Sequence, residues 1–330
     1  MSMGMANTTN KYKLFIGVII AVLCCAVVGI VIVSTNGDVE SETIDDDVNN
    51  YQLITIHNQN YQFNSDLELV LFLGIDTVQN NEVGQSDTIQ LLLMDQAQKN
   101  MKILSLSRDI MTDIRVFNAS GEELGWKQQH LGLAYSYGQT SEQGCQLTID
   151  AISKMLGDIP IINYAAMNMN SIKDLQNIVG TLSIDLTEDY SAFNSQWKKG
   201  KTIQLKPEDA EKFLRTRDTQ MDYSNTLRME KHKVYIEAYL KQLKRMLKDD
   251  FQQVIQRLYH FYENTVTNIT LEEISDYAEM VMNYQIDYEQ SFYTIEGKEQ
   301  VGKYHDEVII DQNQLQDLKL KLFYKKEREK

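Results

Sequence analysis

The chain has 330 residues and a formal net charge of −15, with 43% hydrophobic and 24% charged residues. This composition is ordinary for a globular protein. The acidic balance argues against a nucleic-acid partner, because binding to a phosphate backbone needs a net basic face. A local cluster of arginines in such a chain points instead to a small anionic ligand.

The first element is an uncharged apolar run over residues 14–33, long enough to cross the hydrocarbon core of a bilayer as a helix. Two lysines precede the run and a cluster of acidic residues follows it, so the positive-inside rule places residues 1–13 in the cytoplasm as a short tail. The alternative is a cleaved signal peptide, but its apolar core is usually about 7–15 residues long and ends at a small-residue cleavage site. We therefore expect a single-pass signal-anchor in the cell membrane, with the rest of the chain extracytoplasmic.

Residues 34–65 are polar and acidic, and we interpret them as a solvated extracytoplasmic tether. Two of the three cysteines, Cys24 and Cys25, lie inside the predicted span. Cys145 is alone in the outer part, so an intramolecular disulfide is excluded there and the domain must depend on its core.

Three apolar runs follow the tether. "LELVLFLGID" (67–76) has the nearly continuous apolar character of a central strand buried on both faces. "TIQLLLMD" (88–95) and "KNMKILSLSRD" (99–109) come next, close enough together to form a hairpin. These runs predict adjacent strands of one sheet.

Helical patterns alternate with further strand patterns in the rest of the chain. The predicted helices are 141–156 with Ser141 as its N-cap, 171–180 ending at Gly180, one that begins at Pro207, a long amphipathic helix from Arg228 to about Tyr262, and one opened by the capping box at 270–273. We expect one α/β domain over residues 66–325, with a mixed central sheet flanked by helices, and then a charged tail over 326–330.

Acidic residues close the first predicted strand and open the second. Asp76 and Asp87 project from the same end of the sheet if these strands are neighbours. Carboxylates of this kind suit Mg²⁺, which is usually held by one or two of them together with substrate phosphates. Both residues could equally serve only to cap turns, because Asp is common there.

Arginines gather at two places. Arg108 and Asp109 end the third strand, where they can hold a phosphate or form a salt bridge. Arg215 and Arg217 close a helix, and Arg228 follows. Guanidinium groups grip phosphate in a planar, bidentate manner, and several together could hold a pyrophosphate. At least one of them could instead serve the helix dipole or a local carboxylate.

Read in order, the segments "VLFLGID", "GQSDTIQLLLMD", "KILSLSRD", "HLGLAYSYG" and "RTRDTQMD" resemble the LytR-CpsA-Psr family. The resemblance implies a membrane-anchored enzyme whose outer domain transfers a glycopolymer from undecaprenyl pyrophosphate to peptidoglycan and releases the lipid phosphate. The implied partners are the polyprenyl-pyrophosphate-linked glycopolymer, peptidoglycan and membrane lipid. It also implies that the site residues have these roles: Asp76 and Asp87 bind Mg²⁺, Arg108 and Asp109 form the catalytic pair, and Arg215, Arg217 and Arg228 bind pyrophosphate with Arg108. Asp109 is then one candidate for the base that activates the acceptor hydroxyl; the alternative is that it only orients Arg108 or Arg217.

The chain departs from the family pattern at several positions. Asn225 and Met229 stand where the family has arginine and glutamine, and Ser107 replaces a proline. Two interpretations therefore stay open. One is an active, divergent transferase of teichoic acid, capsule or another glycan. The other is a catalytically impaired protein that binds polyprenyl-linked or anionic glycan and regulates or scaffolds cell-wall assembly.

Overall fold

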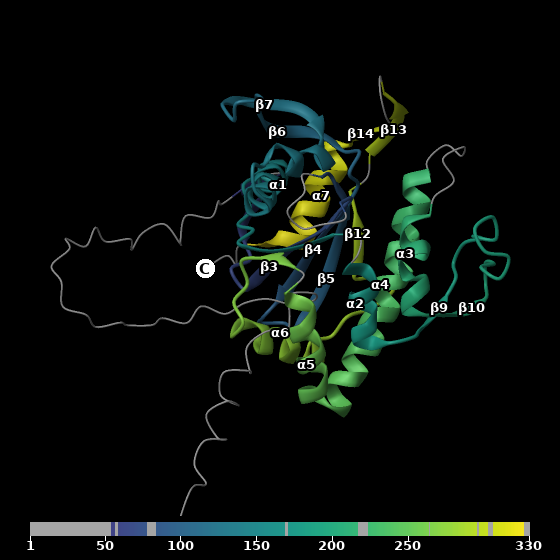
Figure 1. Ribbon diagram of the computed structural model, residues 1–330. Coiled ribbons are helices and arrows are strands. Elements are labelled where there is room, and N and C mark those ends of the chain that lie inside the picture. The colour runs from purple at the N-terminus through teal and green to yellow at the C-terminus, as the bar shows by residue number, and fades with distance from the viewer. Residues whose placement is uncertain are drawn as a thin grey trace, which may run out of the picture.

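The computed structural model describes residues 54–56, 59–77, 84–168, 171–216, 224–263, 265–295, 297–302 and 306–326 (Figure 1). The predicted anchor and its cytoplasmic tail lie outside these residues. Within the described part, no helix combines the length and the apolar character that a membrane crossing requires.

A six-stranded sheet forms the centre of the domain, with its strands in the order β11-β8-β3-β4-β5-β12. The bounds are β3 Leu67–Ile75, β4 Ser86–Asp95, β5 Asn100–Leu106, β8 Asn163–Asn168, β11 Val266–Thr267 and β12 Phe292–Thr294. The β3–β4 and β4–β5 pairs are antiparallel, whereas β3–β8 and β5–β12 are parallel. The sheet is therefore mixed and the hairpin between the second and third apolar runs is confirmed.

Both faces of the sheet are covered by apolar clusters, which explains why the strands read as continuous apolar runs. Val70, Leu92 and Ile103 are cross-strand neighbours on one face and join a cluster with the helices α2, α4, α5 and α6. Leu71 and Leu91 are paired on the other face and join a second cluster with α1 and α7. The bounds of the α-helices are α1 Ser141–Leu156, α2 Ser171–Val179, α3 Pro207–Arg215, α4 Ser224–Asp249, α5 Phe251–Tyr262, α6 Glu273–Asn283 and α7 Gln312–Phe323.

The helix boundaries confirm some predictions and correct others. Pro207 opens α3, and Gly180 follows α2 with a φ of +76°. The single helix expected up to Tyr262 is wrong, because Asp250 interrupts it and caps α5 by accepting a hydrogen bond of 3.0 Å from Gln253 N. The N-cap of α1 is Thr140 instead of Ser141.

The described residues form four smaller sheets in addition to the central one. The pairs are β6 Met111–Phe117 with β7 Glu123–His130, β9 Leu182–Asp185 with β10 Thr202–Leu205, and β13 Gly297–Val301 with β14 Asp306–Ile310. Two short 3₁₀ helices, Leu131–Leu133 and Tyr135–Tyr137, follow β7.

The fourth small sheet corrects the predicted start of the folded region. β1 Ile54–Ile56 and β2 Gln59–Phe63 form a three-stranded sheet with β15 Tyr324–Lys326. These two strands lie within the stretch expected to be a tether. Phe63 is buried and meets the ring of Tyr324 edge-on, with centroids 6.1 Å apart. Polar residues between the few apolar ones had masked this strand pattern.

Candidate functional site

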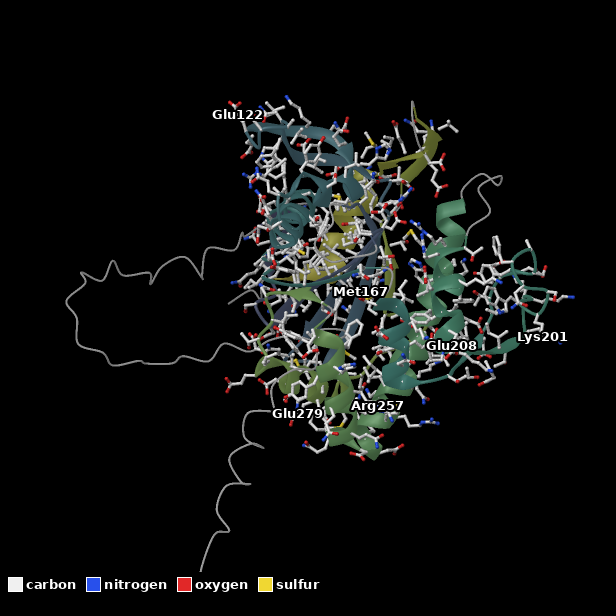
Figure 2. All side chains as sticks on the ribbon, in the orientation of Figure 1. Glu122, Met167, Lys201, Glu208, Arg257 and Glu279 are labelled. Carbon is white, nitrogen blue, oxygen red and sulfur yellow. The ribbon has the colours of Figure 1, made fainter. Side chains whose placement is uncertain are left out.

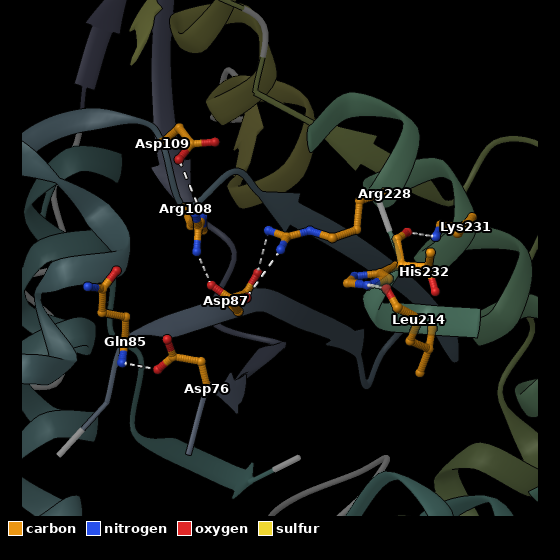
Figure 3. A network of polar contacts seen from close by, with 10 residues as sticks. Asp76, Gln85, Asp87, Arg108, Asp109, Leu214, Arg228, Lys231 and His232 are labelled. Atoms are coloured by element: carbon orange, nitrogen blue, oxygen red, sulfur yellow. Dashed lines mark hydrogen bonds and ion pairs between the residues drawn. The ribbon is translucent and has the colours of Figure 1, made fainter. Parts of the chain in front are cut away.

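The candidate site lies at one end of the central sheet, where β3 and β5 end and β4 begins. Asp76 directly follows β3, Asp87 is the second residue of β4, and Arg108 and Asp109 follow β5. Ile75 and Ser86 are cross-strand partners, so Asp76 and Asp87 lie at the same edge, as predicted (Figure 3).

Asp87 is the centre of a network of alternating charges (Figure 3). Its carboxylate accepts a hydrogen bond from Arg108 through Oδ1 and pairs with Arg228 Nη1 through Oδ2 at 3.2 Å. Arg228 also donates to the backbone oxygen of Asp87 at 3.1 Å. On the other side, Arg108 Nε lies 3.4 Å from Asp109 Oδ1. Four of the predicted residues thus form one connected cluster, to which β4, the end of β5 and α4 contribute.

Burial and neighbouring charges shift the pKa values of two residues in this cluster, Asp109 and Arg108. Desolvation raises the pKa of Asp109, and the nearby cations Arg108 and Arg228 oppose that rise. A raised pKa makes Asp109 a stronger base than an exposed aspartate. Burial is the largest single influence on the pKa of Arg108 and lowers it, but the charges of Asp87, Asp109 and Asp76 and the hydrogen bond to Asp87 together outweigh burial, so the net shift is upward. Arg108 therefore stays cationic at any physiological pH.

Gly132 supports the backbone under Arg108. Its N–H donates to Arg108 O at 2.9 Å, and a Cβ at this position would lie 3.0 Å from both Arg108 Cβ and Ser86 O. The segment "HLGLAYSYG" was noted for its resemblance only, so this packing role was missed. A larger side chain at residue 132 would push the strand ends that carry Arg108 and Asp87 apart.

Asp76 lies beside Asp87 and is exposed. Its Oδ1 accepts a hydrogen bond of 2.6 Å from Gln85 N, and a Cβ on Gly84 would lie 2.8 Å from the same oxygen. The described residues hold no group of three or more His, Cys, Asp or Glu side chains that could enclose a metal. Two neighbouring hard-oxygen carboxylates nevertheless fit Mg²⁺, which completes its coordination with water and phosphate oxygens.

Of the arginines predicted at the end of α3, Arg215 and Arg217, only Arg215 is among the described residues. Arg215, at the end of α3, is paired with Glu211 at 2.7 Å and is not joined to Asp87 by any contact among the described residues. Arg217 lies outside the described residues. Asn225 belongs to the first turn of α4, and its side chain is also outside the described set.

A cavity of about 350 Å³ opens next to the charged cluster. Asp87, Arg108, Arg215 and Arg228 line one part of it, and His232 follows Arg228 on α4. The remaining wall is mostly apolar and comes from the sheet and from α2, α4 and α5; it includes Phe72, Leu92, Ile103, Ala165, Met167, Ile172, Leu175, Tyr235, Ile236, Tyr239 and Phe261. Met167 lies near the middle of the molecule in Figure 2.

This cavity was not predicted. Its wall is built from the same residue types as the core, and the cavity-facing residues of β3, β4 and β5 have the same period as packed ones. The arrangement is suited to a ligand with an anionic head and an apolar tail, because cations and an apolar hollow adjoin each other.

The fold and site together define a class: an α/β domain whose sheet edge carries a cluster of carboxylates and guanidinium groups beside an apolar cavity. The LytR_cpsA_psr family model matches residues 30–323. The chain belongs to this family, as the motif order suggested.

Curated relatives include two transferases. The polyisoprenyl-teichoic acid–peptidoglycan teichoic acid transferase TagU of Halalkalibacterium halodurans is 29% identical over 175 residues, which cover 52% of each chain. TagU of Enterococcus faecalis is 28% identical over 228 residues, covering 68% of this chain and 66% of that one. The alignment with the first relative thus spans about half of its length.

Solved structures share the fold. The crystal structure of TagV from Bacillus subtilis superposes with a TM-score of 0.59 at 21% identity, covering 78% of this chain and 96% of TagV. A structure of TagT bound to LI-WTA gives a TM-score of 0.57 at 22% identity, covering 78% and 90%. At these identities the likeness concerns the fold alone.

Proposed function

We propose that this protein is a membrane-anchored, extracytoplasmic phosphotransferase that attaches an anionic glycopolymer, carried on undecaprenyl pyrophosphate, to peptidoglycan. The observation that carries the proposal is the adjacency of Arg108, Arg228 and Asp87 to an apolar cavity of about 350 Å³. The charged end suits a pyrophosphate and the apolar end suits the first isoprene units. The TagU relatives, named as teichoic acid transferases, support it.

The reaction follows from this placement. A hydroxyl oxygen of the acceptor sugar attacks the phosphorus that carries the glycopolymer, and the bond from that phosphorus to the bridging oxygen breaks. A phosphodiester forms and polyprenyl phosphate leaves. Asp109 accepts the hydroxyl proton, since burial has raised its pKa. Arg108 and Arg228 neutralise charge on the phosphates, which is the main catalytic requirement of phosphoryl transfer.

Asp76 and Asp87 would hold Mg²⁺, which supplies further charge neutralisation on the pyrophosphate when bound. Arg108 and Arg228 contact Asp87 in the structure, and a pyrophosphate would compete for the same guanidinium groups. Arg215 and Arg217 are proposed to add contacts from the end of α3. The predicted span over 14–33 would hold the domain at the outer surface of the cell membrane, near its lipid-linked substrate.

The second candidate function is a binding protein without turnover that regulates or scaffolds wall assembly. Asn225 and Met229 favour it, because they replace the arginine and glutamine of the family pattern. Removing one donor that acts on the transition state typically costs about 10²–10³-fold in rate. Such a protein would keep the cavity and the affinity for a polyprenyl pyrophosphate.

One assay separates the two candidates. The full chain in detergent is incubated with a polyprenyl pyrophosphate, with and without Mg²⁺; water takes the place of the acceptor hydroxyl, and the inorganic phosphate that is released together with polyprenyl phosphate is measured. Arg217→Ala is compared with Arg245→Ala, which removes an exposed arginine from the distal part of α4. The transferase predicts Mg²⁺-dependent release that is lost only in Arg217→Ala. Binding without release, weakened in Arg217→Ala, would establish the binding protein instead.

A further inference from the structure

Two neighbouring residues of α4 bind the end of α3. Lys231 Nζ donates to the backbone oxygen of Thr216, and His232 Nε2 lies 3.2 Å from the backbone oxygen of Leu214 (Figure 3). Burial is the largest cause that lowers the pKa of His232, to about 4, so the ring is neutral and its Nε2 carries the proton donated to Leu214. The last carbonyls of a helix lack partners within the helix and form the negative end of its dipole. α4 thus supplies two donors to the end of α3.

The ammonium group of Lys231 is deeply buried. The residue is only 1% exposed, and its Nζ lies 5.5 Å from the ring centroid of Tyr190, 5.3 Å from Phe193 and 6.0 Å from Phe213. Tyr190 and Phe193 belong to the connection between β9 and β10, whereas Phe213 belongs to α3. Two segments outside α4 therefore enclose one cation of that helix.

This arrangement is not explained by stability. In the part of the chain that the structure describes, no carboxylate forms an ion pair with Lys231. Taking an ammonium group out of water is unfavourable, and an apolar side chain of similar volume often serves the fold as well or better. The aromatic rings recover part of that cost through cation–π attraction. What the lysine contributes specifically is a charged donor to the backbone next to Arg215.

The position of these contacts relates them to the proposed site. Arg215 lies between the two carbonyl groups that are held, and it lines the cavity together with Arg228 and His232. Arg228 is one helical turn before His232, so all three groups of α4 project from adjacent turns. The α4 helix therefore carries Arg228, whose side chain contacts Asp87. Through Lys231 and His232 it also holds the backbone on both sides of Arg215.

We propose that Lys231, together with His232, is a positioning residue that sets the spacing between Arg215 at the end of α3 and Arg228, so that both arginines can contact one pyrophosphate. This inference rests on the proposed function, since it assigns both groups to the same anionic head. With Asn225 in place of an arginine, the site has fewer cations, and its affinity depends more strongly on where the remaining ones stand.

The test is a kinetic comparison of Lys231→Met with Lys241→Met, using the full chain in detergent. Lys241 is an exposed lysine of the same helix, paired with Glu237. Phosphate release from polyprenyl pyrophosphate, binding of inorganic pyrophosphate by calorimetry, and the melting temperature are measured. If Lys231 positions Arg215, its replacement by methionine should misplace that arginine and raise KM by about tenfold or more. The melting temperature should not fall, and Lys241→Met should match the wild type in all three measurements.

Several results would overturn the inference. One is a Lys231→Met variant whose KM and pyrophosphate affinity equal those of the wild type. Another is a Lys231→Met variant in which KM rises and affinity falls but the melting temperature also falls, because the loss of stability would then explain both changes. Should Lys231→Met not fold, His232→Gln replaces it and must show the same rise in KM. If the wild type binds pyrophosphate without releasing phosphate, the transferase proposal fails, and the affinity of Lys231→Met still decides the positioning role. A wild type that does not bind pyrophosphate would overturn both.

Discussion

Replacing Asp87 by asparagine should remove the shared partner of two arginines. In the structure its carboxylate meets Arg108 and Arg228, and Arg228 is buried. Asparagine keeps the size of the side chain and one acceptor oxygen. It loses the negative charge, and its amide group would face a guanidinium donor. The change therefore removes the carboxylate that both cations share at a largely desolvated position.

The size of the effect follows from the geometry. Opposite charges 3.2 Å apart, as for Arg228 and Asp87, attract by ~5 kcal/mol at an effective dielectric constant near 20. Desolvation offsets part of this attraction, and losing one partner of a buried pair typically costs about 3–5 kcal/mol. The side chain of Asp87 is 19% exposed, so the lower end of that range applies. We expect the free energy of unfolding to fall by about 3 kcal/mol in Asp87→Asn.

Urea denaturation of the full chain in detergent measures this loss. With a slope of roughly 3 kcal/mol per molar urea, the midpoint should move down by about 1 M. Asp113→Asn provides the matched control, because Asp113 is exposed on β6 and its replacement should change stability by less than about 0.5 kcal/mol. Equal midpoints for the two variants would refute the reasoning and show that the arginines are satisfied without Asp87.

Two further predictions concern the cavity and the core. Ala165→Phe, on the cavity wall, should weaken binding of polyprenyl pyrophosphate by about tenfold or more while inorganic pyrophosphate still binds, because only the apolar part is filled; equal losses for both ligands in calorimetry would contradict this. Burial is the largest cause that raises the pKa of Glu68, to about 8, so the folded chain keeps a proton that the unfolded chain loses above pH 4.5. The stability contributed by this proton is complete below pH 4.5 and is lost as pH rises to 8. Glu68→Gln should therefore raise the melting temperature more at pH 8 than at pH 5, and a parallel pH dependence in the two proteins would exclude this explanation.

The sequence was most informative where one physical cause dominates. The runs that form β3, β4 and β5 are almost entirely apolar because helices cover both faces of the sheet. The shared position of Asp76 and Asp87 at one end of the sheet follows directly from the pairing of β3 with β4. The strand termini therefore predict most members of the cluster from the sequence.

Other features depend on contacts that periodicity does not record. The apolar pattern continues through Asp250, so the break between α4 and α5 depends on one capping side chain. The sequence predicts Arg215 as a pyrophosphate ligand, yet in the structure Arg215 forms an ion pair with Glu211, one turn earlier on the same helix. Lys231 is one of many lysines on an amphipathic helix, and only the approach of Phe213 and the β9–β10 connection makes it distinctive.

The three-stranded sheet of β1, β2 and β15 has a mechanical consequence. A pulling force applied to the chain on the amino-terminal side of β1 would first separate β1 from β2 and then β2 from β15, since β2 is the middle strand. The carboxyl-terminal strand therefore shares the load at the point where the amino-terminal part enters the domain, with Lys325 paired to Asp66 at 2.7 Å. We therefore expect the pairing of β15 with β2 to bear part of such a force before it reaches β3.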